Sequence, residues 1–188
     1  LATGGCVYIV VSLLVHRLIK NRTIEFLLAD AIELTATYLE VQEKINWEES
    51  TDTLKLQNTL LKTQSAINEK HEALRVLLLH NVEKITASNK TKRYYLLFLE
   101  LITVYEMAIG KYIQLDEWKN ELEGHFEKTR VFRKISKSMI SQLQQLAEAI
   151  RFRKAYSLPA SVGNLFREAE GVIADYIEQV KPPKAREG

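Results

Sequence analysis

Cysteine, proline and glycine are all scarce in this chain. Its 188 residues include one cysteine, three prolines and seven glycines. The lone cysteine, Cys6, excludes an intramolecular disulfide and a cysteine-rich metal site. No glycine or proline lies between Cys6 and Ile109, so more than half of the chain lacks a strong helix breaker. We therefore expect long helices joined by few turns.

Motifs that carry catalysis are also missing. The four histidines share no His-x-x-x-His spacing of the kind that binds zinc. The sequence contains no glycine-rich phosphate loop, no Gly-x-Ser-x-Gly elbow and no paired-cysteine motif. We therefore predict that the chain is not an enzyme, that it holds no cofactor, and that it has no catalytic, cofactor-binding or metal-binding residues.

The formal net charge of +2 hides an unequal distribution. Residues 1–22 contain Arg17, Lys20 and Arg22 and no acidic residue, whereas the other 166 residues hold 23 basic and 24 acidic residues. Binding to nucleic acid needs a clustered basic face that contacts phosphates. The nearly neutral body therefore argues against a nucleic-acid partner.

Residues 1–15 contain no charged side chain. Fifteen helical residues extend about 22 Å. A helix needs roughly 20 residues to span a hydrocarbon core, so this segment is shorter than a full span. The basic residues follow the apolar run, whereas a signal peptide has them in front, and they match a cytoplasmic membrane flank. We favour residues 1–18 as the C-terminal part of a transmembrane helix, with a buried helix of a soluble protein as the alternative. The start at Leu1 in place of methionine is typical of a fragment.

The remaining residues predict an all-α fold, an antiparallel bundle of about five helices whose first helix continues from the membrane segment. Apolar residues recur every three or four positions, the spacing of an amphipathic helix. The expected helices cover 24–45, 53–79, 94–109, 116–156 and 162–180, with a loop at 80–91. The bundle domain then spans 19–181, and 182–188 form a tail or linker.

Residues 94–109 are the most apolar of these helices. Thirteen of the sixteen residues are apolar, which predicts a central core helix wrapped by the others. Gly110 and the segment 114–116 predict a bend after it. In the helix 53–79, Gln64 and His71 occupy seam positions, where polar groups either fix the helix register or lie at a wet edge.

Arg75 and Glu106 form a candidate structural ion pair. Each lies within an apolar stretch of its helix. If the two helices are antiparallel neighbours, pairing would avoid the cost of unpaired buried charges. The alternative is that Arg75 extends to solvent and Glu106 lies on a helix surface.

Several stretches together resemble the fusaric acid resistance protein-like (FUSC) inner-membrane family, in particular its YccS/YhfK branch. They are LLVHRLIKNR followed directly by TIEFLLADAIELTATYLE, then EALRVLLLH at 72–80 and KRYYLLFLELITVYEMAIGKY at 92–112. The residues that carry the resemblance, apart from apolar spacing, are Arg75, Arg93, Glu106 and Tyr112.

The resemblance implies a location and a function. In that family a helical cytoplasmic domain lies between two sets of membrane helices, and relatives export aromatic carboxylic acids. It implies that this chain is the cytoplasmic domain of a multi-pass transporter or efflux-like protein of the bacterial inner membrane, with residues 19–188 in the cytoplasm. The implied partners are the lipid bilayer through residues 1–18 and the remaining transmembrane helices. A homo-oligomer of the chain is a further expectation. A ligand-sensing receptor bundle and a soluble helical adaptor are the alternatives.

Overall fold

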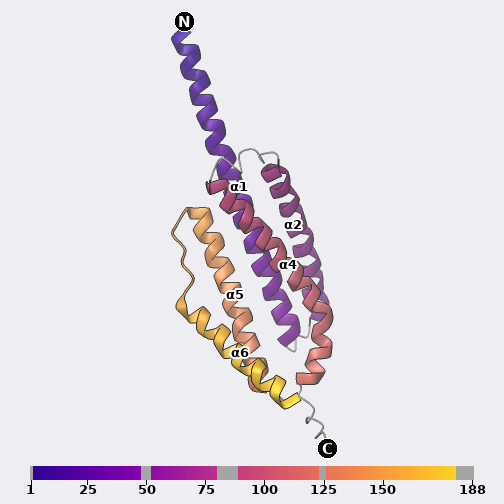
Figure 1. Cartoon of the computed structure of the whole chain (residues 1–188). Helices are drawn as coiled ribbons and strands as arrows, with labels where there is room; N and C mark the ends of the chain where they lie inside the picture. The colour runs from indigo at the N-terminus through magenta and orange to yellow at the C-terminus, as the bar shows by residue number, and fades with distance from the viewer. Residues whose placement is uncertain (1, 48–51, 80–88, 123–125, 181–188) are drawn as a thin grey trace, which may run out of the picture.

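The computed structural model describes residues 2–47, 52–79, 89–122 and 126–180. Side-chain surroundings are described for 22–47, 52–79, 89–110 and 130–175. The described residues form five helices and no strand, which confirms the predicted all-α bundle. The helices are α1 (Ala2–Trp47), α2 (Thr53–Leu79), α4 (Asn89–Leu122), α5 (Phe126–Phe152) and α6 (Ala160–Val180). Figure 1 shows α1 projecting beyond the other helices at its N-terminal end.

Helix α1 is the central element of the bundle. It contacts α2, α4 and α5, and Leu28, Ala31 and Ile32 on it are completely buried. It runs unbroken from the apolar segment into the bundle, as the sequence predicts. Residues of α1 and of the helices around it form two core layers. One contains Leu28, Ile32, Leu74, Leu78, Phe98, Leu101 and Ala147, and the other contains Tyr38, Val41, Leu60, Ile67, Tyr105 and Ala108.

The prediction that 94–109 is the central helix is wrong. This segment belongs to α4, which packs against one side of α1 and leaves Leu96, Leu99 and Met107 at least 41% exposed. The apolar content of α4 therefore overstates its burial. Several buried residues of α1 are small or polar, such as Ala29 and Thr35. A count of large apolar residues in the sequence therefore does not identify α1 as the central helix.

The predicted bend after Gly110 is also wrong, because α4 runs through this residue to Leu122. A single glycine inside a helix costs only about 1 kcal/mol relative to alanine, so flanking residues readily carry the helix past it. Residues 89–91 of the predicted loop are helical as well, while residues 80–88 lie outside the described part of the chain. The single predicted helix 116–156 is divided between the end of α4 and α5.

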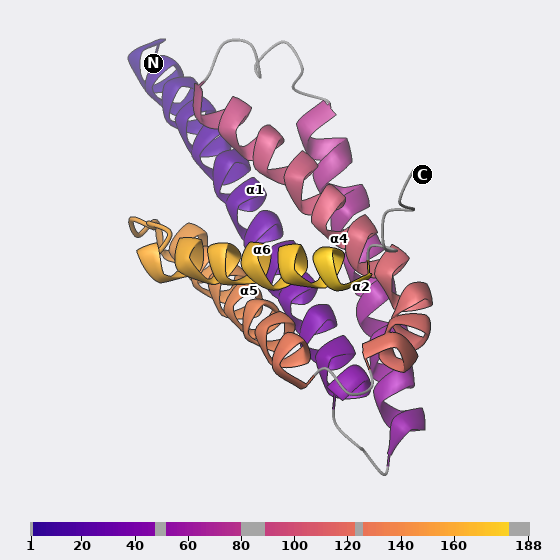
Figure 2. The same ribbon diagram turned by 60° about the horizontal axis from the view of Figure 1, so that its bottom comes forward.

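Helix α6 packs on α5 and crosses it obliquely, as Figure 2 shows. Its described buried residues are Val162 and Ala169, whereas Phe166 and Ile173 are 52% and 43% exposed. Lys134 of α5 pairs with Glu168 of α6 at 3.3 Å. The helix predicted over 162–180 is therefore present as α6, and its large side chains Phe166 and Ile173 stay partly in solvent.

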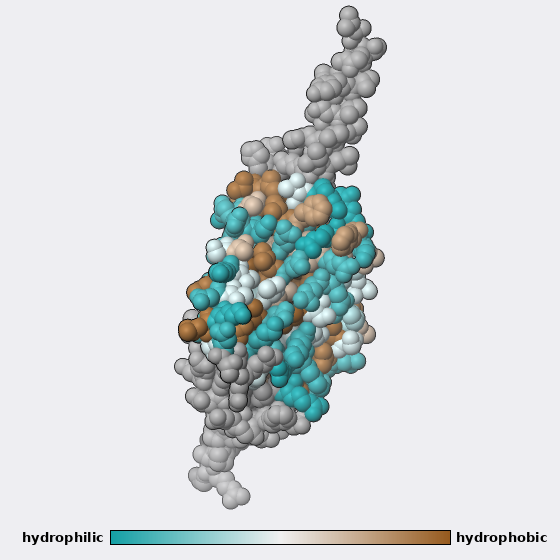
Figure 3. Space-filling model, turned by 180° about the vertical axis from the view of Figure 1, so that it is seen from behind, coloured by the Kyte–Doolittle hydropathy of each residue, from teal (hydrophilic) through white to brown (hydrophobic). Residues whose placement is uncertain are grey.

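The described surface carries charged and apolar residues side by side. On the face seen from behind in Figure 3, hydrophobic residues lie between hydrophilic ones. Within the described residues, no helix contains a stretch both long and apolar enough to cross a membrane.

Candidate functional site

The most unusual side chain in the bundle is Glu25, a carboxylate on α1 with no exposed surface. Arg153 Nε donates to its Oε2 at 2.8 Å, and Lys90 Nζ lies 2.7 Å from its Oε1. Tyr94 Oη donates to Oε1 at 2.8 Å, and Arg22 donates to Oε2 at 3.1 Å. Three cations and one hydroxyl, from α1, α4 and the residue that follows α5, therefore converge on one buried carboxylate.

This arrangement determines the charge of Glu25. Burial alone raises the pKa of Glu25, because it disfavours the charged carboxylate. The hydrogen bonds from Arg153 and the other donors outweigh burial and lower the pKa from 4.5 to about 2. In turn, the hydrogen bond to Glu25 raises the pKa of Lys90. Glu25 is therefore a permanent anion at neutral pH, and Lys90 and Arg153 stay charged because their pKa values are raised by the hydrogen bonds to Glu25.

Arg153 owes its position to the way in which α5 ends. Its φ of 53° is the only positive value among the described residues other than glycine. Its amide donates to the Ile150 carbonyl at 3.3 Å, and the Lys154 amide donates to the Ala149 carbonyl at 2.8 Å. These two bonds form a Schellman motif, whose left-handed position usually holds glycine. An arginine here accepts a conformational cost and presents its guanidinium to Glu25.

A pocket of about 290 Å³ opens beside this cluster. Its cations are Lys90, Arg153 and Lys154, and its other lining residues are Tyr94, Tyr156, Leu146, Ala149 and Ile150. Tyr156 Oη donates to Gln142 at 3.0 Å, and Lys154 pairs with Glu148 at 2.8 Å. The pocket therefore combines cationic and phenolic groups with an apolar wall, a surface that suits an anion with an apolar body.

Further ion pairs fix the register of α1 against α5. Arg151 lies 2.9 Å from Asp30 and 2.6 Å from Glu33, and Arg133 Nε donates to buried Glu43 at 2.7 Å. As positions advance along α1, their partners recede along α5, so the two helices are antiparallel. The pairs hold Arg153 and Lys154 at the level of Glu25.

His71 lies in the α2–α4 seam and not at a wet edge. Its ring packs edge-on against Phe98 and Tyr105 of α4, with centroids 5.7 and 5.5 Å away. Among the described residues, its Nε2 and the Tyr105 hydroxyl are buried without a hydrogen-bond partner. Burial lowers the pKa of His71, and the nearby charge of Glu106 opposes this only in part.

We expect stability to depend on pH through His71. The folded chain keeps this imidazole neutral, while the unfolded chain protonates it below about pH 6.5. Stability should therefore fall as the pH drops below 6.5, by at most about 1.4 kcal/mol per pH unit. Urea unfolding of the wild type and of His71→Phe, measured from about pH 7.5 down to about pH 5.5, tests this. As the pH falls, the free energy of unfolding should decrease more steeply for the wild type than for His71→Phe. Equal slopes in both proteins would contradict the prediction.

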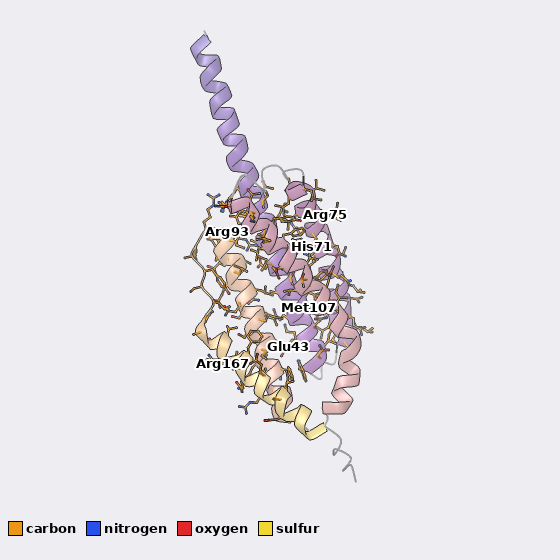
Figure 4. All side chains as sticks on the ribbon, viewed as in Figure 1. Glu43, His71, Arg75, Arg93, Met107 and Arg167 are labelled. Atoms are coloured by element: carbon orange, nitrogen blue, oxygen red, sulfur yellow. The ribbon has the colours of Figure 1, made fainter. Side chains whose placement is uncertain are left out.

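The structure pairs Arg75 with Glu72 of its own helix, not with Glu106. Both Arg75 and Glu106 are exposed, and Figure 4 shows Arg75 on α2. The premise of the predicted pair, that both charges are buried, is therefore wrong. No ion pair joins these two residues within the described part of the chain, and Glu106 acts instead on the charge state of His71.

The sequence did not reveal the Glu25 cluster. Lys90 and Arg153 are 65 and 128 positions away from Glu25, so no local spacing connects them. The one signal was Glu25 itself, which lies beside Ile24 and one turn before Leu28 on the buried side of α1. A carboxylate at such a position needs partners from other helices.

Comparison with models of protein families identifies the family of this chain. Residues 1–187 match the family model described as FUSC-like inner membrane protein yccS. No curated protein matches the chain, and no solved structure matches it. The match confirms the resemblance that the sequence motifs indicated. It covers nearly the whole sequence, and the chain therefore belongs to the family of FUSC-like inner membrane proteins of the yccS type.

Proposed function

We propose that this chain is the cytoplasmic helical domain of a transporter-like inner-membrane protein, and that the pocket beside Glu25 binds organic anions for export. Membership of an inner-membrane protein family supports the membrane location. The observation that carries the proposal is the pocket itself, with three cations and two phenols around an apolar wall.

The charge balance of the pocket favours an anionic ligand. Glu25 compensates only part of the charge of Arg22, Lys90 and Arg153, and Lys154 adds a further cation paired with exposed Glu148. A carboxylate would receive charge-assisted hydrogen bonds, while Leu146 and Ile150 would contact its apolar body. A volume of about 290 Å³ suits a ligand with a single ring.

Binding, and not chemistry, is the proposed role of the bundle. A general base works best with a pKa near the operating pH. The pKa of Glu25 is about 2, and both of its oxygens accept hydrogen bonds. Glu25 therefore serves to hold the cations in place and is poorly suited to proton transfer.

Binding of benzoate to the full chain tests the proposal. We expect isothermal titration to detect benzoate binding, and Lys154→Gln to weaken it about tenfold through loss of one charge-assisted hydrogen bond. Lys154 is the best site for the substitution because it does not contact Glu25 directly. The parent membrane protein carrying Lys154→Gln should export labelled benzoate more slowly from cells.

Lys134→Gln is the matched control. This lysine also lies on the α5 side of the bundle and pairs with an exposed glutamate, but it does not line the pocket. It should leave the benzoate affinity unchanged. Equal affinity of wild type and Lys154→Gln, or equal binding of the uncharged analogue benzyl alcohol, would refute an anion site.

A further inference from the structure

The end of the bundle from which α1 projects carries exposed phenylalanines beside exposed cations. Phe26 and Phe152 are 41% and 60% exposed. The Arg22 guanidinium carbon lies 4.3 Å from the Phe26 ring centroid, and Lys154 Nζ lies 5.3 Å from that of Phe152. We call these four side chains, together with Lys92 and Arg93 of α4, the basic rim, which has six members: Arg22, Phe26, Lys92, Arg93, Phe152 and Lys154.

Lys92 and Arg93 are the least compensated charges of the basic rim. Both are exposed, and neither has a carboxylate partner among the described residues. They follow Lys90, which bonds to Glu25, and Figure 4 shows Arg93 at the end of the bundle near the projecting α1. Lys92 and Arg93 therefore form a cationic surface that no described part of the chain neutralises.

The basic rim lies close to the apolar segment of α1. Arg22 follows Val15 by seven positions in one continuous helix, a rise of about 10 Å. The headgroup layer of a bilayer is about 5–8 Å thick, and the Debye length at physiological salt is about 8 Å. If residues 1–15 lie in the bilayer, the rim is at the level where anionic headgroups attract Lys and Arg.

The two kinds of side chain in the rim fit a lipid surface together. Lysine and arginine bind phosphate, while aromatic rings enter the boundary between headgroups and acyl chains. A soluble anion would use the cations but would leave Phe26 and Phe152 exposed. The combination favours a bilayer over a free ligand.

We propose that the basic rim binds anionic phospholipid headgroups of the leaflet from which α1 emerges. This contact fixes the bundle against the membrane surface. The rim shares Lys154 with the pocket, but Lys92 and Arg93 do not line the pocket, so a change at these two residues tests the rim alone. The rim thereby sets the orientation of α4 and α5 relative to the bilayer.

Lipid retention by the full chain tests this proposal. The chain is extracted in neutral detergent from membranes that mix phosphatidylcholine with phosphatidylglycerol, and retained lipids are quantified by mass spectrometry. We expect enrichment of phosphatidylglycerol over its bulk fraction. Lys92→Gln/Arg93→Gln should reduce its retention roughly tenfold or more, because each charge near an anionic surface contributes about fivefold in affinity.

Two matched double variants complete the experiment. Lys92→Arg/Arg93→Lys keeps both charges and should keep the enrichment, whereas Lys55→Gln/Lys62→Gln removes two exposed charges from the remote half of α2 and should not alter it. Circular dichroism verifies that each variant is folded. Retention at the bulk lipid ratio in the wild type, or unchanged enrichment in Lys92→Gln/Arg93→Gln, would overturn the proposal.

Discussion

Replacing Glu25 by glutamine should lower the free energy of unfolding by about 2–3 kcal/mol at pH 7. The substitution keeps the shape of the side chain but removes the charge on which Arg153, Lys90 and Arg22 converge. A fully buried pair loses about 3–5 kcal/mol when one partner is removed. We expect less here because Lys90 and Arg153 are half-exposed and can regain water. Urea unfolding of the full chain in neutral detergent micelles measures the difference.

The pH dependence of Glu25→Gln provides a second measure. The pKa of Glu25 is lowered from 4.5 to about 2 on folding, so the unfolded chain takes up the proton first as pH falls. The stabilisation is complete above about pH 4.5 and is lost as the pH falls towards 2. The glutamine variant should lack this loss. Glu40→Gln, which breaks an exposed pair with Lys44, should cost less than about 0.5 kcal/mol.

Replacing Leu28 by alanine should destabilise the bundle by about 3 kcal/mol, within the range of 2–5 kcal/mol for buried leucines. Leu28 has no exposed surface and belongs to the core layer where α1 meets the other helices. Truncation loses buried apolar area and leaves a cavity that rigid neighbours fill only in part. Urea unfolding monitored by circular dichroism gives the change.

Leu99→Ala on α4 is the matched control for Leu28→Ala. Leu99 is 41% exposed, so its truncation should cost less than about 1 kcal/mol. The pair distinguishes a bundle centred on α1 from one centred on the more apolar α4. A larger loss for Leu99→Ala than for Leu28→Ala would contradict the central position of α1.

The positions of several helices could be predicted from the sequence because helical periodicity depends on local spacing. The segment 53–79 coincides with α2, and the continuity of α1 follows from the lack of glycine and proline after Cys6. The sequence did not predict which helix is central. Burial depends on neighbours, and α1 buries alanine, threonine and glutamate where an apolar count expects leucine.

By itself, the sequence determined the all-α class, the asymmetric placement of charge and the family resemblance, since each rests on residue type and short spacing. Only the tertiary structure decided the candidate site. Glu25, Lys90 and Arg153 come from distant parts of the chain, and the antiparallel packing of α5 on α1 joins them. A buried charge selects its partners through three-dimensional proximity, so the pocket exists only after the helices have packed.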